Sequence, residues 1–284
     1  LNPEALVLLA DAIKFMAAVN SVTFDGNPIG YPSSATLKPG AVTGIEVKKG
    51  VFAAVDGRFG EVTKDPDSDS EVKLRWLDDG SEGQFGGRPY IKTDKLTSVV
   101  ASRTDLIEDY SHIRSLGEAL SGSKVQTYGF ANCKFNPFSL ATFVESVRWA
   151  EAVVKKVTLS KNFLFGSKLE YGDFGDTIHD IDADQTGWSS LCDSFKGSSI
   201  EELILCDVGM GVNGVASLAD AILFMAALNE VNVAFNQIGS EGGIALRDAL
   251  KTSNLKFLAI GKMYTSVDGT VITGSQLTTG VTLY

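Results

Sequence analysis

One glycine-rich segment has the residue types and spacing of a phosphate-binding turn. Gly209-Met210-Gly211-Val212-Asn213-Gly214 follows the apolar run ELILCDV and precedes an apolar helical pattern. In a dinucleotide-binding turn, such glycines let backbone N–H groups at a helix N-terminus approach a pyrophosphate. However, the next predicted strand, Val231 to Phe235, is followed by Asn236, where a ribose-binding carboxylate is expected. A nucleotide-binding enzyme using Gly209–Gly214 therefore stays an alternative interpretation.

Three carboxylates with a spacing of two residues form a second candidate. Asp180, Asp182 and Asp184 resemble the opening of a calcium loop, but Gln185 and Leu191 occupy the positions that require Gly and Glu. We instead expect a strand over Ile181 to Ala183 that projects these carboxylates on one side. Together with Glu202, they are predicted to bind a basic partner protein.

Little else in the sequence suggests catalysis. The two histidines, His112 and His179, lack metal-ligand spacing, and no G-x-S-x-G, P-loop or Cys-x-x-Cys motif occurs. We predict no catalytic residue, no metal and no cofactor, and thus a protein that is not an enzyme. Three widely spaced cysteines favour reduced thiols in a reducing compartment, either cytoplasm or organelle interior.

Charge and hydropathy restrict the partners. The net charge of −10 disfavours nucleic acid and favours proteins with basic surfaces. No run of 18 apolar residues occurs, so no transmembrane segment is expected. The chain starts at Leu1 rather than Met, which suggests a processed or partial chain.

The elements that would position these residues belong to an internal repeat. The segment LADAIKFMAAVNSVTFDGNPIG, from Leu9 to Gly30, returns as LADAILFMAALNEVNVAFNQIG, from Leu218 to Gly239, with 14 of 22 positions identical. Each copy has a helical pattern, a short strand and an Asn-x-Ile-Gly turn. Such a unit cannot bury its own apolar face, so we expect it to stack on neighbouring units.

Similar short strands recur along the chain, several of them followed by Asn or Cys at a fixed offset. The Asn side chain can bond free backbone groups where the strand turns into a loop. The predicted strands begin at Val22, Tyr128, Val157, Ile181, Leu203, Val231 and Leu258.

The segment Val231 to Leu250 resembles the ribonuclease-inhibitor type of leucine-rich repeat. Its signature residues are Ile238, Gly239, Glu241, Gly242, Ala245 and Leu246. The resemblance covers roughly 1–30 and 103–265. It implies a curved solenoid with parallel strands on the inner face, helices outside, and surfaces that bind other proteins.

A segment of different character interrupts the first unit. Between about Gly44 and Ser98, short alternating strands are separated by turn formers. The order GRFGEV, an acidic turn, VKLRW and DDG resembles Src-homology-3-like barrels of the Tudor and chromo-barrel kind. This resemblance implies peptide binding through exposed aromatics, unless these side chains fill the small core. The candidates are Phe59, Trp76, Phe85 and Tyr90.

We therefore predict an α/β leucine-rich-repeat solenoid of about seven units with an inserted small all-β barrel. The expected parts are a first repeat over 1–40, a barrel over 44–98, further repeats over 103–265 and a cap or tail over 266–284. The leading function is a non-catalytic protein–protein interaction scaffold or accessory subunit of a hetero-oligomeric assembly. The alternatives are a peptide-reading barrel and the nucleotide-binding enzyme.

Overall fold

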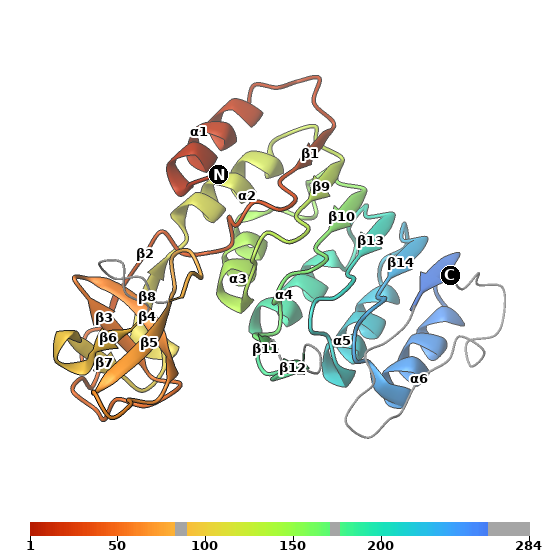
Figure 1. The fold of residues 1–284 in the computed structure, drawn as a ribbon. Coiled ribbons are helices and arrows are strands. Elements are labelled where there is room, and N and C mark those ends of the chain that lie inside the picture. Colours follow the sequence, from red (N-terminus) through yellow and green to blue (C-terminus); the bar gives the residue numbers. More distant parts are fainter. Residues whose placement is uncertain (83–89, 171–176, 261–284) are drawn as a thin grey trace. The chain divides into compact units, whose positions relative to one another are not determined.

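The computed structural model describes residues 1–82, 90–170 and 177–260, which form two compact units (Figure 1). The sheet unit comprises Leu1–Gly30 and the chain from His112 onward, and the inserted unit comprises Tyr31–Ser111. Phe85 and the predicted tail over 266–284 lie outside the described residues.

The sheet unit contains a six-stranded parallel sheet (Figure 1). Its strands are, in spatial order, β1 (Ser21–Thr23), β9 (Thr127–Gly129), β10 (Lys156–Thr158), β13 (Glu202–Ile204), β14 (Glu230–Asn232) and β15 (Phe257–Ala259). The first apolar residues of the predicted strands pair directly, in the order Val22, Tyr128, Val157, Leu203, Val231 and Leu258. Equivalent positions of the recurring apolar triplets thus pair in the observed register, although the chain between the triplets differs in length.

Helices connect these strands and lie along one side of the sheet (Figure 1). They are α1 (Pro3–Ile13), α2 (Ser111–Ser121), α3 (Pro137–Ser146), α4 (Thr186–Phe195), α5 (Val212–Ile222) and α6 (Gly239–Leu250). The predicted mixed α/β fold with parallel strands, helices and a separate antiparallel unit is confirmed.

Aromatic side chains dominate the core between the first strands and helices of the sheet unit. The rings of Phe24 and Phe130 stack with centroids 5.5 Å apart, and Phe143 meets Phe130 edge-on at 5.0 Å. Trp149 contacts Phe195 of α4 at 5.1 Å. Burial of these large apolar surfaces is the main stabilising contribution of the unit.

The predicted strand from Ile181 to Ala183 is wrong. In its place, β11 (Lys168–Glu170) and β12 (Thr177–His179) form an antiparallel pair outside the parallel sheet, and the chain then turns. Asp180 and Asp182 have positive φ values of 58° and 56°. Asp tolerates this left-handed conformation better than most residues, so alternation alone did not indicate a strand here.

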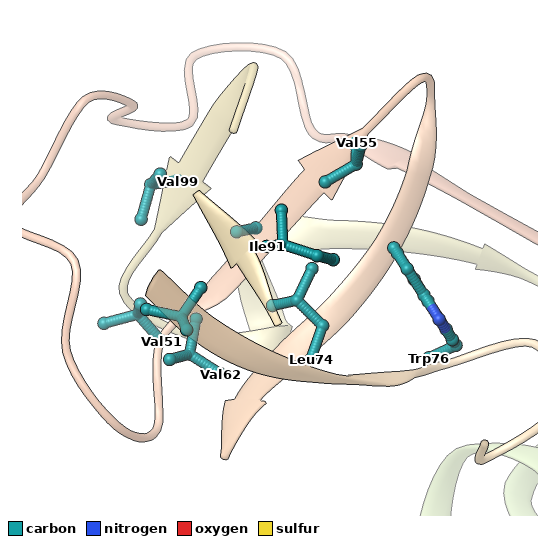
Figure 2. Packing of buried hydrophobic residues seen from close by; sticks show 9 residues of the cluster. Val51, Val55, Val62, Leu74, Trp76, Ile91 and Val99 are labelled. Atoms are coloured by element: carbon teal, nitrogen blue, oxygen red, sulfur yellow. The ribbon is translucent and has the colours of Figure 1, made fainter. Parts of the chain in front are cut away.

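The inserted unit is a curled antiparallel half-barrel. Its sheet has the order β6 (Ile91–Lys92), β5 (Glu71–Trp76), β4 (Arg58–Lys64), β3 (Phe52–Val55) and β7 (Ser98–Val100). Figure 2 shows its labelled core side chains gathered on one face of the sheet, among them Val62, Leu74 and Trp76. Asp56 and Gly57 connect β3 to β4 with positive φ values of 50° and 81°, as a tight hairpin requires.

A second pair of strands extends this unit beyond the predicted limits of 44 and 98. β2 (Ser34–Leu37) pairs with β8 (Leu106–Asp109), and two 3-10 turns, Thr93–Lys95 and Arg103–Asp105, precede β7 and β8. The Ser33 N–H donates to the carbonyl of Asp109 at 2.8 Å. The incoming and outgoing chains of the inserted unit therefore run side by side.

Candidate functional site

The glycine-rich turn before α5 encloses a carboxylate of the same chain. The Gly211 N–H donates to Asp182 Oδ1 at 2.8 Å, and the N–H groups of Asn213 and Gly214 donate to Oδ2 at 2.8 and 3.3 Å. These donors are the unpaired N–H groups that begin a helix, where a negative charge is most stabilising. Asp182 thus takes the position that a phosphate would occupy in a nucleotide-binding turn.

The same contacts account for the three glycines. A Cβ on Gly211 would lie 2.5 Å from Asp182 Oδ2, and one on Gly214 would lie 2.7 Å from the Phe165 ring. Gly209 has a φ of +76°, and a Cβ there would overlap the Ser167 hydroxyl. The G-x-G-x-x-G pattern therefore has a structural reason in this fold that involves no nucleotide.

The remaining predicted acidic residues do not share a strand face with Asp182. The Asp184 carboxylate accepts a bond from the Thr186 N–H at 2.9 Å, at the start of α4. Glu202 lies on β13 and forms an ion pair of 2.6 Å with Lys156 on β10. The prediction that Asp180, Asp182 and Asp184 project from one side of a strand is therefore wrong, because these residues form a turn. Glu202 lies apart from them and has a basic neighbour. Binding of a partner by these residues stays a prediction.

Two of the four candidate aromatics belong to the core of the inserted unit. Phe59 is 8% exposed and Trp76 is 2% exposed. Tyr90 is half-buried, with the ammonium groups of Lys64 and Lys73 5.1 and 5.2 Å from its ring centroid. Because two lysines already flank the Tyr90 ring, this ring does not offer an open aromatic surface to a cationic side chain of a partner. Phe85 lies outside the described residues.

A polar cluster that sequence reasoning missed lies beside these aromatics. The Arg58 guanidinium lies 4.5 Å from the Trp76 ring centroid and bonds the carboxylates of Asp78 and Asp79, each at 2.7 Å. Burial alone would raise the pKa of Asp79, but bonds from Ser81 and the nearby Arg58 charge lower it. The only sequence signal was the Asp-Asp-Gly turn, which we interpreted as a connection between strands.

A pocket of about 310 Å³ opens next to this cluster. Arg58, Phe59 and Asp78 line it together with Ser34 and Ala35 of β2. The pocket therefore combines one apolar ring with charges of both signs.

The cysteines are free thiols with little tendency to ionise. Burial raises the pKa of Cys133 to about 12, and burial also raises the pKa values of Cys192 and Cys206. The thiolate is the nucleophilic form, so these groups are poorly suited to catalysis. Among the residues that the structure describes, no three His, Cys, Asp or Glu side chains gather as metal ligands.

Two buried asparagines that follow strands of the sheet unit bond free backbone groups, as their position in the sequence predicted. Asn162 Oδ1 accepts bonds from the N–H groups of Cys133 and Phe135, both at 3.0 Å, and its Nδ2 donates to the Phe130 carbonyl at 2.7 Å. Asn236 makes the corresponding three bonds to Val208, Met210 and Leu205. Each Asn therefore supplies hydrogen-bond partners to backbone groups in and beside the loop that follows the preceding strand.

No protein-family model matches the chain, and no curated protein matches it in sequence. Within the described ranges, no helix has the length and apolar character needed to cross a bilayer.

Proposed function

We propose that this protein is a non-catalytic interaction scaffold or accessory subunit of a larger assembly. In this proposal the sheet unit is a leucine-rich-repeat solenoid of the ribonuclease-inhibitor type, and the inserted unit is a Src-homology-3-like or Tudor-like barrel. Both units would offer docking surfaces. The net charge of −10 favours partners with basic surfaces.

Exposed large apolar side chains carry this proposal. Phe15 is 86% exposed and Leu8 is 72% exposed, and Phe224, which corresponds to Phe15 in the second copy, is 61% exposed. Large exposed apolar patches mark protein-binding surfaces, and we propose that these side chains contribute to such patches. The N–H groups of the glycine-rich turn, in contrast, already bond Asp182.

Purification from the native source under mild salt, followed by cross-linking mass spectrometry, tests the proposal. We expect stoichiometric co-purifying proteins whose cross-links map to the sheet unit. Phe15→Ser and Phe224→Ser should release them, whereas Ala216→Ser, at an exposed position of α5, should not. A chain that remains free of partners at physiological salt would refute the scaffold.

A peptide-reading function of the inserted unit is the second candidate, and the pocket beside Phe59 is the observation that favours it. Ser34→Trp, at an exposed position of the pocket wall, places a bulky ring in this pocket. If the pocket reads peptides, this variant should lose binding on a peptide array while its melting temperature stays near that of the parent. Equal binding by parent and variant would remove this function.

A further inference from the structure

The two copies of the 22-residue repeat occupy different environments in the same molecule. The second copy, Leu218 to Gly239, lies inside the sheet unit, where β14 has β13 on one side and β15 on the other. The first copy carries β1, which lies at the end of the strand order with β9 as its neighbour. The packing around the second copy therefore indicates which kind of element would cover the exposed surface of the first copy.

Identical residues differ in burial between the copies. Met225 is 2% exposed, whereas its equivalent Met16 is 39% exposed. Val231 is fully buried, whereas Val22 is half-buried. Burial is likewise greater in the second copy for three further pairs, namely Leu218 and Leu9, Ala221 and Ala12, and Asn236 and Asn27. These residues form the β1 face, which we define as Leu9, Ala12, Met16, Val22 and Asn27.

The Asn at the centre of the β1 face lacks the partners of its equivalents. Asn162 and Asn236 each accept bonds from two backbone N–H groups of the preceding loop. Asn27 keeps the bond to its own strand, to the Phe24 carbonyl at 3.0 Å, and its Oδ1 accepts a bond of 3.2 Å from the Leu1 nitrogen. An additional strand and loop would supply the missing pair of donors.

The outer edge of β1 also has a defined pattern of backbone groups. On the second copy, the Glu230 N–H donates to the Glu201 carbonyl at 3.1 Å, directly before β13, and the Asn232 carbonyl accepts a bond of 2.8 Å from the Leu205 N–H. The equivalent groups on β1 are the Ser21 N–H and the Thr23 carbonyl, for which the described part of the chain records no backbone partner. An added strand would need to run parallel to β1 in this register.

We propose that the β1 face binds an extended segment of a partner protein as an additional parallel strand, followed by a loop whose N–H groups bond Asn27. This inference rests on the proposed scaffold function. Strand addition gains affinity from backbone bonds and specificity from alternate side chains. The segment would carry apolar residues at alternate positions against Val22 and Met16, with basic residues beside them.

A second copy of this chain fits the β1 face less well. It carries the same net charge of −10, so the approach of two copies is opposed by long-range repulsion. Pairing β1 of one copy with β15 of another would also repeat head to tail, which produces rings or open polymers instead of a simple dimer. A basic segment from a different protein avoids both problems.

The probe is a synthetic peptide of residues 124–135, KVQTYGFANCKF, with Cys133→Ser to prevent oxidation. In the protein this segment precedes Asn162 and bonds it as a partner would bond Asn27, and it carries two lysines and no acid. Fluorescence anisotropy with the full chain should show saturable binding that a scrambled peptide lacks. Binding should also protect Met16 from peroxide oxidation in peptide mapping.

Two variants test whether the peptide binds at the β1 face. Ser21→Pro removes an outward N–H from the edge and should abolish binding, with Ser21→Ala as its control. Met16→Glu adds charge to the β1 face at a partly exposed position and should weaken binding at least tenfold. Ala17→Glu is its matched control, since Ala17 and its equivalent Ala226 are both exposed.

Other outcomes separate the two proposals. Binding that Ser21→Pro and Met16→Glu leave unchanged overturns the inference, as does an unprotected Met16. Dimers of the parent in light scattering that Ser21→Pro abolishes would assign the face to a second copy and overturn it too. If native partners stay bound to Ser21→Pro but leave Phe224→Ser, the scaffold stands and the β1 inference falls. If the peptide binds and no native partner exists, the scaffold falls and the inference that rests on it falls as well.

Discussion

Removing the Asp182 carboxylate should destabilise the sheet unit without touching its core. Asp182 accepts bonds from three backbone N–H groups at the start of α5. Asn213 is exposed, so water can replace its bond, whereas Gly211 and Gly214 are buried. One lost helix cap costs about 1 kcal/mol, up to about 2 kcal/mol. With two donors left uncompensated, we expect Asp182→Ala to cost about 2–3 kcal/mol.

The assay is thermal unfolding followed by circular dichroism. For a domain of 150–250 residues, about 2–4 °C is lost per kcal/mol, so the melting temperature should fall by roughly 4–12 °C. Asp220→Asn is the matched control, because Asp220 is an exposed residue of α5 and the charge change is the same. Asp184→Ala removes one acceptor, for the Thr186 N–H, and should cost about 1 kcal/mol or less.

A second measurement distinguishes loss of this contact from general damage. Once Asp182 is removed, three N–H groups at a helix start form an anion site. Inorganic phosphate should then restore part of the melting temperature of Asp182→Ala and leave the parent unchanged, since only the variant has a vacant site. If Asp182→Ala melts within 1 °C of Asp220→Asn, or if phosphate stabilises the parent equally, the reasoning is refuted.

Further predictions address the core, the inserted unit and the thiols. Leu205→Asp and Val233→Asp should abolish soluble, folded protein, because an unpaired buried charge costs several kcal/mol; parent-like melting would contradict the packing. Replacing Tyr31–Ser111 by a short Gly/Ser bridge should leave the sheet unit folded in circular dichroism, since the two chains that enter and leave it are hydrogen bonded; loss of soluble expression would show otherwise. Cys133 should resist alkylation at pH 8 until denaturant is added. Because its folded pKa of about 12 exceeds the ordinary value of 9.0, its contribution to stability is complete below pH 9 and is lost as the pH rises toward 12, which urea titrations at several pH values can measure.

The parallel strands were predictable because each has the same short apolar triplet, whereas spacing alone also predicted the wrong strand over Ile181 to Ala183. Val157, Leu203 and Val231 are each the first apolar residue of a similar triplet, and they lie opposite one another in adjacent strands. The Asn at the fixed offset was equally informative, since its amide matches the free groups of the preceding loop. Both signals arise from side chains that become buried where one unit packs against the preceding one.

The turn around Asp182 could not be predicted from the local sequence. Alternating Asp and apolar residues are compatible with a strand and with a turn in which Asp has positive φ. Only the N–H groups near Gly211, which are distant in sequence, decide between the two. The aromatics posed a similar problem, because alternation shows that Leu74 and Trp76 share a face but not whether that face is covered.

The glycine-rich turn shows why a motif has to be interpreted from its contacts. Three N–H groups at the start of a helix attract any anion of suitable shape, and their geometry does not distinguish a pyrophosphate from a carboxylate. Here Asp182 arrives from a turn that the repeat spacing had assigned to a strand, and it forms the bonds that a ligand would need. The wrong strand prediction and the carboxylate bound in the glycine-rich turn thus have one cause. Because β12 ends at His179, Asp182 leaves the strand path and reaches the helix start instead.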